Sequence, residues 1–288
     1  MKGFKAFGKG MICRGKQYAE NTVFEEKEAV ICRSGMHFCE NPLDVLDSYP
    51  LIDINGNIVE VAEVEALDEC QTDDNKKYCT KKLKIGFKLS LSAFVKAAID
   101  FAFEKSDDKV LTGDCAKLAS SGDYAKLASS GDCAKLASSG DCAQLASSGD
   151  YAQLAGSGYC AKLASSGDCA QLASSGDYAQ LASSGYCAKL ASSGYGAKLA
   201  SSGDCAKLAS SGDCAQLASS GDGAVIAGIG ICNTAKGKKG SWLVLAEWVY
   251  NDIEEKYIPV CVKAAQIDGA VIKEDTFYKL ENGEFKEA

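Results

Sequence analysis

A nine-residue unit repeats twelve times without interruption between Gly113 and Ser220, and a degenerate thirteenth copy ends at Ile229. Its consensus is Gly-Asp/Tyr-Cys/Tyr-Ala-Lys/Gln-Leu-Ala-Ser-Ser, and we number these positions one to nine. A short fixed period is typical of a structural unit that cannot bury its own apolar side chains and must stack on its neighbours. The array therefore predicts a solenoid rather than a globular domain with an active site.

The pattern within the unit favours a strand over a long helix. Nine helical residues make about two and a half turns, so successive leucines would point to opposite sides. In a strand from position three to position seven, the alanine at position four and the leucine at position six share a face. We expect these positions, beginning with Ala116 and Leu118, to form the core. Position three holds either cysteine or tyrosine and should face outward, because a packed interior resists such a change of volume.

The remaining residues of the unit are typical of a turn. Ser-Ser-Gly-Asp combines a glycine that can take positive φ with an aspartate that can accept hydrogen bonds from nearby backbone amides. We therefore expect each strand to end at this tetrapeptide.

The number of repeats per coil is open. One repeat spans at most about 30 Å, too little to enclose a core, so we prefer two repeats per coil in a flat, two-sided β-solenoid. Tyr124, Tyr151 and Tyr178 recur every third repeat, which is compatible with a three-sided coil or with duplication of a longer segment. A solenoid of very short helices is a further alternative, since aspartate caps helices and glycine ends them.

The chain as a whole should be mainly β and divides into three parts. We expect an α+β head domain at 1–108, the nonapeptide-repeat solenoid at 109–229 and a β-strand C-terminal cap at 230–288. Ser106–Asp108 is the expected linker between head and array. A cap is needed because the end of a solenoid exposes unpaired strand groups.

Both flanking parts carry recognisable element signals. Asn41 followed by Pro42 predicts the start of a short helix, and apolar spacing predicts a second helix over 92–104. Strand patterns in the head cover 2–7, 29–32 and 58–67, and those in the cap cover 242–249, 257–265 and 271–280, with hairpin signals at Asp268-Gly269 and Asn282-Gly283.

Composition restricts the compartment and the partners. The 31 basic and 39 acidic residues give a net charge of −8, which argues against binding to nucleic acid or to an anionic membrane and favours basic partners. The first residues carry no apolar run followed by a cleavage site. Fifteen cysteines without a secretion signal indicate free thiols. We expect a cytoplasmic protein with no cofactor.

Three head motifs, Cys13–Tyr18, Ser34–Leu43 and Glu63–Ala66, together resemble an N-terminal domain of unknown function in many bacteriophage and prophage proteins. Those proteins often continue with a related nonapeptide array and a strand-rich end similar to Trp242–Leu245 and Asp275–Tyr278. The resemblance implies a phage or prophage setting, hence a host cytoplasm, and a β-solenoid. It implies no reaction.

One enzymatic hypothesis concerns the head. The expected strand over 58–67 would place Glu63 and Glu65 on its apolar face. The order of Arg14, His37 and Glu65 resembles the layout of ADP-ribosyltransferases, and by that resemblance these residues would bind NAD and act on it. The Ser-Thr-Ser strand and the second site histidine of that family are missing, so an enzyme remains the alternative.

A metal site is a weaker alternative. Cys13, Cys32, His37 and Cys39 carry ligand atoms that zinc prefers. No Cys-x-x-Cys pair supports such a site, and ordinary buried cysteines explain the pattern better.

The array itself could imitate DNA. Aspartate holds position two in ten of the thirteen copies and would form columns of negative charge. Seven lysines at position five offset much of that charge, and turn formation explains the aspartates equally well.

We therefore expect a non-catalytic interaction or scaffold protein of phage type. Its solenoid should present regular rows of side chains to a protein partner, a host factor being one candidate. Exposed aromatic rows and open sheet edges also favour homo-oligomers. The expected binding surface consists of Tyr124, Tyr151, Tyr159, Tyr178, Tyr186 and Tyr195.

Overall fold

The computed structural model describes the chain except for residues 32, 54–56, 106–109 and 112. The linker expected at Ser106–Asp108 lies outside the described residues, and so does Cys32. The fold is mainly β, as the sequence predicts. In the described part, no helix is both long and apolar enough to cross a membrane.

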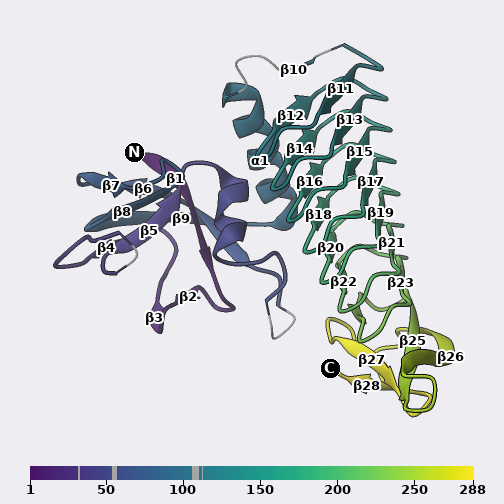
Figure 1. The fold of residues 1–288 in the computed structure, drawn as a ribbon. Coiled ribbons are helices and arrows are strands. Elements are labelled where there is room, and N and C mark those ends of the chain that lie inside the picture. The colour runs from purple at the N-terminus through teal and green to yellow at the C-terminus, as the bar shows by residue number, and fades with distance from the viewer. Residues whose placement is uncertain (32, 54–56, 106–109, 112) are drawn as a thin grey trace. The chain divides into compact units, whose positions relative to one another are not determined.

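The first of two compact units, Met1–Phe101, is built on a seven-stranded antiparallel sheet (Figure 1). The strand order is β4-β9-β6-β1-β5-β8-β7, and a separate two-stranded hairpin joins β2 and β3. The elements are β1 (Lys2–Phe7), β2 (Ile12–Cys13), β3 (Lys16–Gln17), β4 (Val23–Glu25), β5 (Met36–Cys39), η1 (Pro42–Asp47), β6 (Glu60–Ala66), β7 (Cys70–Thr72), β8 (Lys77–Thr80), β9 (Lys82–Leu89) and α1 (Leu91–Lys105).

The helix signals of this unit are confirmed. The side-chain Oδ1 of Asn41 accepts a hydrogen bond from the backbone N–H of Leu43 at 3.1 Å, so it caps the 3-10 helix η1. The second predicted helix, 92–104, forms α1 and buries Phe94 and Ile99. Of the strand expected at 29–32, the described residues form only an isolated bridge between Val30 and Ser34.

The buried face of β6 differs from the predicted one. Ala62, Val64 and Ala66 belong to the core of this unit, so Glu63 and Glu65 lie on the other face of the strand. The pairing of β6 with β1 has no register shift, so side chains alternate along the strand, and the prediction took the face of Val61, rather than that of Val64, as the one toward this core. The expectation that both glutamates share the apolar face is therefore wrong.

The second unit, Ala102–Ala288, contains the β-solenoid, which makes about seven turns over 117–245. Its strands stack into two sheets (Figure 1). The ten-stranded sheet holds β10 (Val110–Leu111), β12 (Lys126–Ser129), β14 (Gln144–Ser147), β16 (Lys162–Ser165), β18 (Gln180–Ser183), β20 (Lys198–Ser201), β22 (Gln216–Ser219), β24 (Thr234–Lys236), β27 (Tyr278–Glu281) and β28 (Glu284–Glu287). The nine-stranded sheet holds β11 (Lys117–Ser120), β13 (Lys135–Ser138), β15 (Gln153–Gly156), β17 (Gln171–Ser174), β19 (Lys189–Ser192), β21 (Lys207–Ser210), β23 (Val225–Gly228), β25 (Trp242–Asn251) and β26 (Lys256–Gln266).

The solenoid has two repeats per coil, as preferred from the sequence. Strands pair in parallel with the second strand after them, so that Leu145 lies opposite Leu163 and Leu154 opposite Leu172. Residues 18 positions apart therefore occupy equivalent places in successive coils. This register excludes both the three-sided coil and the solenoid of short helices.

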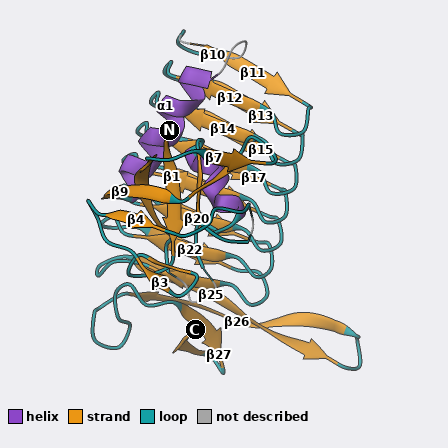
Figure 2. Ribbon diagram, turned by 90° about the vertical axis from the view of Figure 1, so that its left-hand side faces the viewer, coloured by secondary structure: helices purple, strands orange, loops and turns teal. Residues whose placement is uncertain are grey.

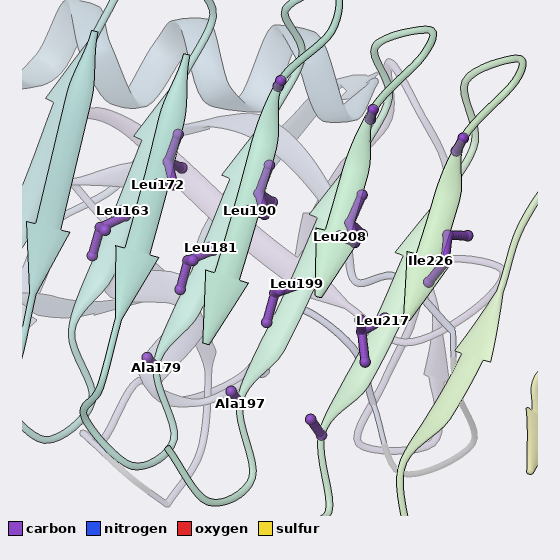
Figure 3. Packing of buried hydrophobic residues seen from close by; sticks show 14 of the residues in the cluster. Leu163, Leu172, Ala179, Leu181, Leu190, Ala197, Leu199, Leu208, Leu217 and Ile226 are labelled. Atoms are coloured by element: carbon purple, nitrogen blue, oxygen red, sulfur yellow. The ribbon is translucent and has the colours of Figure 1, made fainter. Parts of the chain in front are cut away.

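The core of the solenoid consists of the expected alanines at position four and leucines at position six. Ala161 and Ala170 are fully buried, and Leu163 and Leu172 are each 1% exposed. In Figure 3 the leucines of each sheet, for example Leu181 and Leu199, follow one another from coil to coil. Each repeat thus buries little by itself, and the stack supplies the continuous apolar interior.

The strands begin two residues later than predicted. They cover positions five to eight, as in Lys117–Ser120, instead of three to seven. The reason is position three, whose cysteines and tyrosines all have φ between 54° and 57°, in the left-handed region. A residue in that conformation turns the chain and cannot belong to a strand. Its side chain still faces outward, as expected: Cys115 and Tyr124 are exposed.

The glycine at position one has a different role from the predicted one. Left-handed glycines of the array, Gly196 and Gly223, lie at position three. At position one the backbones of neighbouring coils nearly touch: a Cβ added to Gly167 would lie 2.0 Å from the carbonyl oxygen of Gly149. Glycine is therefore required there by the close approach of coils and not by positive φ.

The aspartates at position two also act between coils rather than locally. The Oδ1 of Asp150 accepts a hydrogen bond from the backbone N–H of Asp168 at 2.7 Å, and that of Asp168 accepts one from Tyr186 at 2.8 Å. The same contact joins Asp132 to Asp150. The aspartate columns therefore support the stacking of the coils at both edges.

The C-terminal strands continue and close the solenoid. β25 extends the nine-stranded sheet in parallel, and β26 then pairs with it antiparallel. The predicted hairpin at Asn282-Gly283 joins β27 to β28, with both turn residues at positive φ. The hairpin expected at Asp268-Gly269 is instead a turn in which Asp268 accepts three backbone hydrogen bonds, and the chain stays irregular until Tyr278.

Candidate functional sites

Three exposed tyrosines gather at one edge of the solenoid. Tyr159 and Tyr195 hold position two of their repeats, and Tyr178 holds position three of the repeat that lies between them in the stack. The ring centroids of Tyr159 and Tyr178 are 5.5 Å apart, and so are those of Tyr178 and Tyr195. The exposed fractions of the three residues are 51%, 44% and 45% in chain order. We call Tyr159, Tyr178 and Tyr195 the tyrosine cluster.

Backbone contacts between coils hold this cluster in place. The backbone N–H of Tyr195 donates to Oδ1 of Asp177 at 2.8 Å, and that of Tyr178 donates to the carbonyl oxygen of Tyr195 at 2.7 Å. The rings consequently extend from a backbone that is fixed before any partner binds, which reduces the entropy cost of binding.

The position-two column at this edge combines aromatic rings with carboxylates. Tyr159 and Tyr195 alternate along the stack with Asp141, Asp177 and Asp213. Tyrosine rings attract cations through their faces, and carboxylates attract them directly. The edge is therefore suited to a partner segment that carries basic and apolar side chains.

The other predicted tyrosines are exposed but lie elsewhere. Tyr124 is at the same edge, nearer the start of the solenoid, whereas Tyr151 and Tyr186 lie at the opposite edge. Hydrogen bonding between the hydroxyl of Tyr186 and the thiols of Cys187 and Cys205 raises the pKa of Tyr186 to about 12. The fourteen described cysteines are all free thiols.

A shallow groove also runs over the open face of the nine-stranded sheet. Its volume is about 970 Å³, and its walls are alanine and serine with one glycine, for example Ala155 and Ser175. It carries no charged or aromatic side chain, so it lacks groups that would recognise a ligand.

The first unit contains a second candidate site, a cavity of about 540 Å³ that we call the head cavity. Its lining residues include members of β1, β5, η1 and the hairpin of β2 and β3. Aromatic side chains of Tyr18, Phe38 and Tyr49 form part of its wall. Its basic lining residues are Lys5, Arg14, Lys16, Arg33 and Lys77, and its one acidic lining residue is Glu26.

Lys5 is the most unusual of these basic residues because its side chain is buried. Lys5 is 5% exposed, and its Nζ donates to the carbonyl oxygen of His37 at 2.8 Å and lies 5.4 Å from the ring centroid of Tyr18. Burial lowers the pKa of this amine. Within the described residues no carboxylate pairs with it, and its other polar neighbours include the side chains of Cys13 and Cys39.

The hairpin turn places another cation at the cavity. Arg14 and Gly15 form the turn between β2 and β3, with φ of 50° and 77°. A non-glycine residue with positive φ is uncommon and often marks a functional site. On the same hairpin, Lys16 forms an ion pair with Glu26, which neutralises the acid of the cavity.

Two further groups have altered acidity. Burial, together with the charges of Lys77, Lys5 and Arg14, lowers the pKa of His37 to about 4. Burial also raises the pKa of Tyr49, whose hydroxyl donates to Sγ of Cys13 at 3.0 Å. At neutral pH His37 is therefore uncharged and Tyr49 protonated, and the cavity can stabilise negative charge but holds no free carboxylate for base chemistry.

The structure brings together only part of the proposed enzymatic set. Arg14 and His37 both line the head cavity, whereas Glu65 is not among the described residues that line it. Cys13 and Cys39 also line it, but the described residues contain no group of three or more ligating side chains that could hold a metal ion. Cys32, the fourth residue of the zinc hypothesis, lies outside the described residues.

The sequence reasoning missed most of the head cavity. The cavity residues that it missed come from five separate segments, and their spacing follows no motif. They are Lys5, Tyr18, Arg33, Tyr49 and Lys77. The available signal was local: Arg14-Gly15 between two short strands predicts a hairpin that displays a cation.

Comparison with known proteins gave a match to a family model, and it covers most of the first unit. Residues 1–97 match a family model described as Domain of unknown function (DUF7666). A search of curated proteins found no match, and a search of solved structures found none either.

Proposed function

We propose that this chain is a non-catalytic interaction protein of phage or prophage type, whose solenoid presents the tyrosine cluster to a protein partner. The observation that carries the proposal is the contact of three exposed rings on a backbone fixed by cross-coil hydrogen bonds. Tyrosine is enriched at the energetic centres of interfaces because it adds large contact area at low entropy cost.

The negative charge beside the tyrosine cluster favours a partner with basic side chains. Asp141, Asp177 and Asp213 flank the rings, and the chain has a net charge of −8. A partner segment with arginine or lysine between apolar residues would contact ring faces and carboxylates together. We propose such a basic segment of a host or phage protein as the ligand.

The test compares two triple variants of the full chain. Replacement of Tyr159, Tyr178 and Tyr195 by serine removes the tyrosine cluster, and replacement of Tyr124, Tyr151 and Tyr186 by serine is the matched control. Both sets are exposed, and both should leave the circular dichroism spectrum unchanged. A partner captured from bacterial lysate is identified by mass spectrometry, and its affinity for each chain is then measured.

We expect the cluster variant to bind the captured partner at least tenfold more weakly, since each exposed tyrosine at an interface centre contributes about 1–2 kcal/mol. The control variant should bind like the unchanged chain. Equal binding by the cluster variant would reject this surface as the binding site.

An NAD-using head is a weaker candidate because Glu65 is not at the head cavity. DNA mimicry is also weaker: the aspartates of position two accept hydrogen bonds from the next coil, which accounts for them without a ligand. Self-association is favoured by a different feature, the exposed edge strand β26.

A further inference from the structure

We propose that the head cavity binds a small organic molecule through a phosphate monoester group. This site lies in the first unit and does not depend on the interaction surface of the solenoid. The residues that would hold the phosphate are Lys5, Arg14, Arg33 and Lys77.

The first argument is the excess of positive charge. Lys16 and Glu26 neutralise each other, and the remaining four cations of the cavity have no carboxylate partner among the described residues. This excess is local, because the chain as a whole carries a net charge of −8. Cations that line one cavity without neighbouring carboxylates repel one another. An anion bound between them would attract each of them and offset that repulsion.

The second argument is the cost of burying Lys5. An ammonium group away from water is unfavourable unless it is paired, and the pKa of Lys5 is lowered accordingly. Because Lys5 and Arg14 both line the cavity, an anion bound there would be the missing partner of this ammonium group. Binding of an anion would raise this pKa again.

The third argument concerns the kind of anion. Two guanidinium groups, from Arg14 and Arg33, offer planar pairs of donors that match phosphate oxygens, and Lys5 and Lys77 add point charges. Four positive charges suit a dianion better than a monoanionic carboxylate. A phosphate monoester is the common biological dianion of this size.

The fourth argument concerns the rest of the ligand. A volume of about 540 Å³ exceeds what a phosphate ion needs and lies in the range of sites for small organic molecules. The rings of Tyr18, Phe38 and Tyr49 provide an apolar wall on which a flat group could pack. A nucleoside monophosphate fits this combination, and a sugar phosphate shares its anionic part.

Isothermal titration calorimetry of the full chain tests the proposal. The probes are adenosine 5′-monophosphate, glucose 6-phosphate and inorganic phosphate, with adenosine as the uncharged control. Variants are Arg14→Gln and Lys77→Gln, with Lys81→Gln as the matched control, because Lys81 is an exposed cation of the same unit that does not line the cavity.

We expect saturable binding of the phosphate-bearing probes, weakened by added salt, with adenosine at least tenfold weaker than adenosine 5′-monophosphate. Each cavity variant should lose at least tenfold in affinity while its melting temperature and that of the Lys81→Gln chain stay unchanged. Tighter binding of adenosine 5′-monophosphate than of glucose 6-phosphate would show that the aromatic wall contacts the base. Equal affinities would show that the cavity recognises only the phosphate group.

The proposal is overturned if none of the phosphate probes binds at millimolar concentration, or if adenosine binds as tightly as its monophosphate. It is also overturned if every cavity variant that folds binds as well as the Lys81→Gln chain. Two variants on different elements keep the test decisive if one of them fails to fold.

Discussion

At the scale of single residues, one backbone conformation explains the composition of the array. Position three lies in the left-handed region in every copy that carries cysteine or tyrosine there, at a cost of about 1 kcal/mol for each non-glycine residue. The side chain extends from the turn into solvent, so its volume is unrestricted and cysteine, tyrosine and glycine all occur. This freedom accommodates Tyr178 without disturbing the core, while its neighbours Tyr159 and Tyr195 extend from position two.

His37 provides a prediction at this scale. It is the one histidine of the chain, so a single imidazole signal should titrate in the folded protein, with a pKa of about 4. Because Lys77 contributes the largest charge effect, Lys77→Gln should raise this pKa, whereas Lys81→Gln should leave it unchanged. Proton nuclear magnetic resonance of the imidazole as a function of pH measures both values.

The lowered pKa of His37 also determines how the stability of the first unit depends on pH. The folded pKa is below the ordinary value of 6.5, so the unfolded state binds more protons between these two values. Stability of the first unit should therefore fall as the pH drops from about 6.5 to about 4, by roughly 1 kcal/mol once the partial exposure of His37 is considered. A folded-state pKa near 6.5 would contradict the burial of this side chain.

At the scale of elements, the coil is held together by contacts at equivalent positions of neighbouring coils. Parallel strands pair residue by residue, aspartates accept hydrogen bonds from the next coil, and glycines let the turns approach closely. These contacts recur with little change along the array. The solenoid is therefore stabilised by nearest-neighbour interfaces.

Gly167→Ala should disrupt one such interface. The added Cβ would lie 2.0 Å from the carbonyl oxygen of Gly149, and the coils would have to separate, at a cost of about 2–4 kcal/mol. Gly113→Ala is the matched control, since nothing lies within 4 Å of its added Cβ. Urea unfolding followed by circular dichroism should show a lower midpoint for Gly167→Ala and an unchanged or slightly higher one for Gly113→Ala. Equal midpoints would mean that the close approach is not required.

The repeat period was enough to predict the core and the number of repeats per coil, because alternation and chain length are properties of the sequence. The strand limits were wrong because a strand argument assumes that position three is extended, and nothing in Cys115 or Tyr124 signals a left-handed backbone. The role of Gly167 was missed for a related reason: close approach between coils is visible only once they are stacked.

In the whole molecule, the two sheets of the solenoid end at the edge strands β26 and β28. β26 is the last strand of the nine-stranded sheet, and Val260 and Val262 are 52% and 61% exposed. Figure 2 shows the hairpin of β25 and β26 reaching beyond the neighbouring strands, and Ile253 in its loop is 94% exposed. An exposed apolar edge of this kind favours strand pairing with another chain.

We propose that β26 pairs with its copy in a second chain. An antiparallel pairing centred on Cys261 places Lys263 opposite Pro259 and Lys256 opposite Gln266, so that no two lysines face each other. Light scattering coupled to size-exclusion chromatography should give twice the chain mass of 30.2 kDa. Val262→Lys should give the monomer mass, and Val271→Lys, an exposed valine outside the strand, should not. A monomeric unchanged chain would reject the pairing.

The two candidate sites differ in how far the sequence could predict them. The exposed tyrosines follow from the repeat, although the contact of Tyr178 with its two neighbours required the coil register. Lys5, Arg33 and Lys77 line the same cavity only in the folded protein. Their spacing in the sequence does not predict that they lie close together. The face of β6 that packs against the core was also hard to predict, because buried valines lie on both faces, Val61 on one and Val64 on the other.

The 18-residue register also determines how the solenoid would respond to a pulling force along its axis. Each coil is bound mainly to the coils before and after it, so tension on the ends would peel coils away one at a time. Every event would release 18 residues, or about 60 Å of extended chain, and neighbouring events would need similar forces. The chain would thus act as a graded mechanical tether that lengthens in equal steps while the coils that remain stay folded.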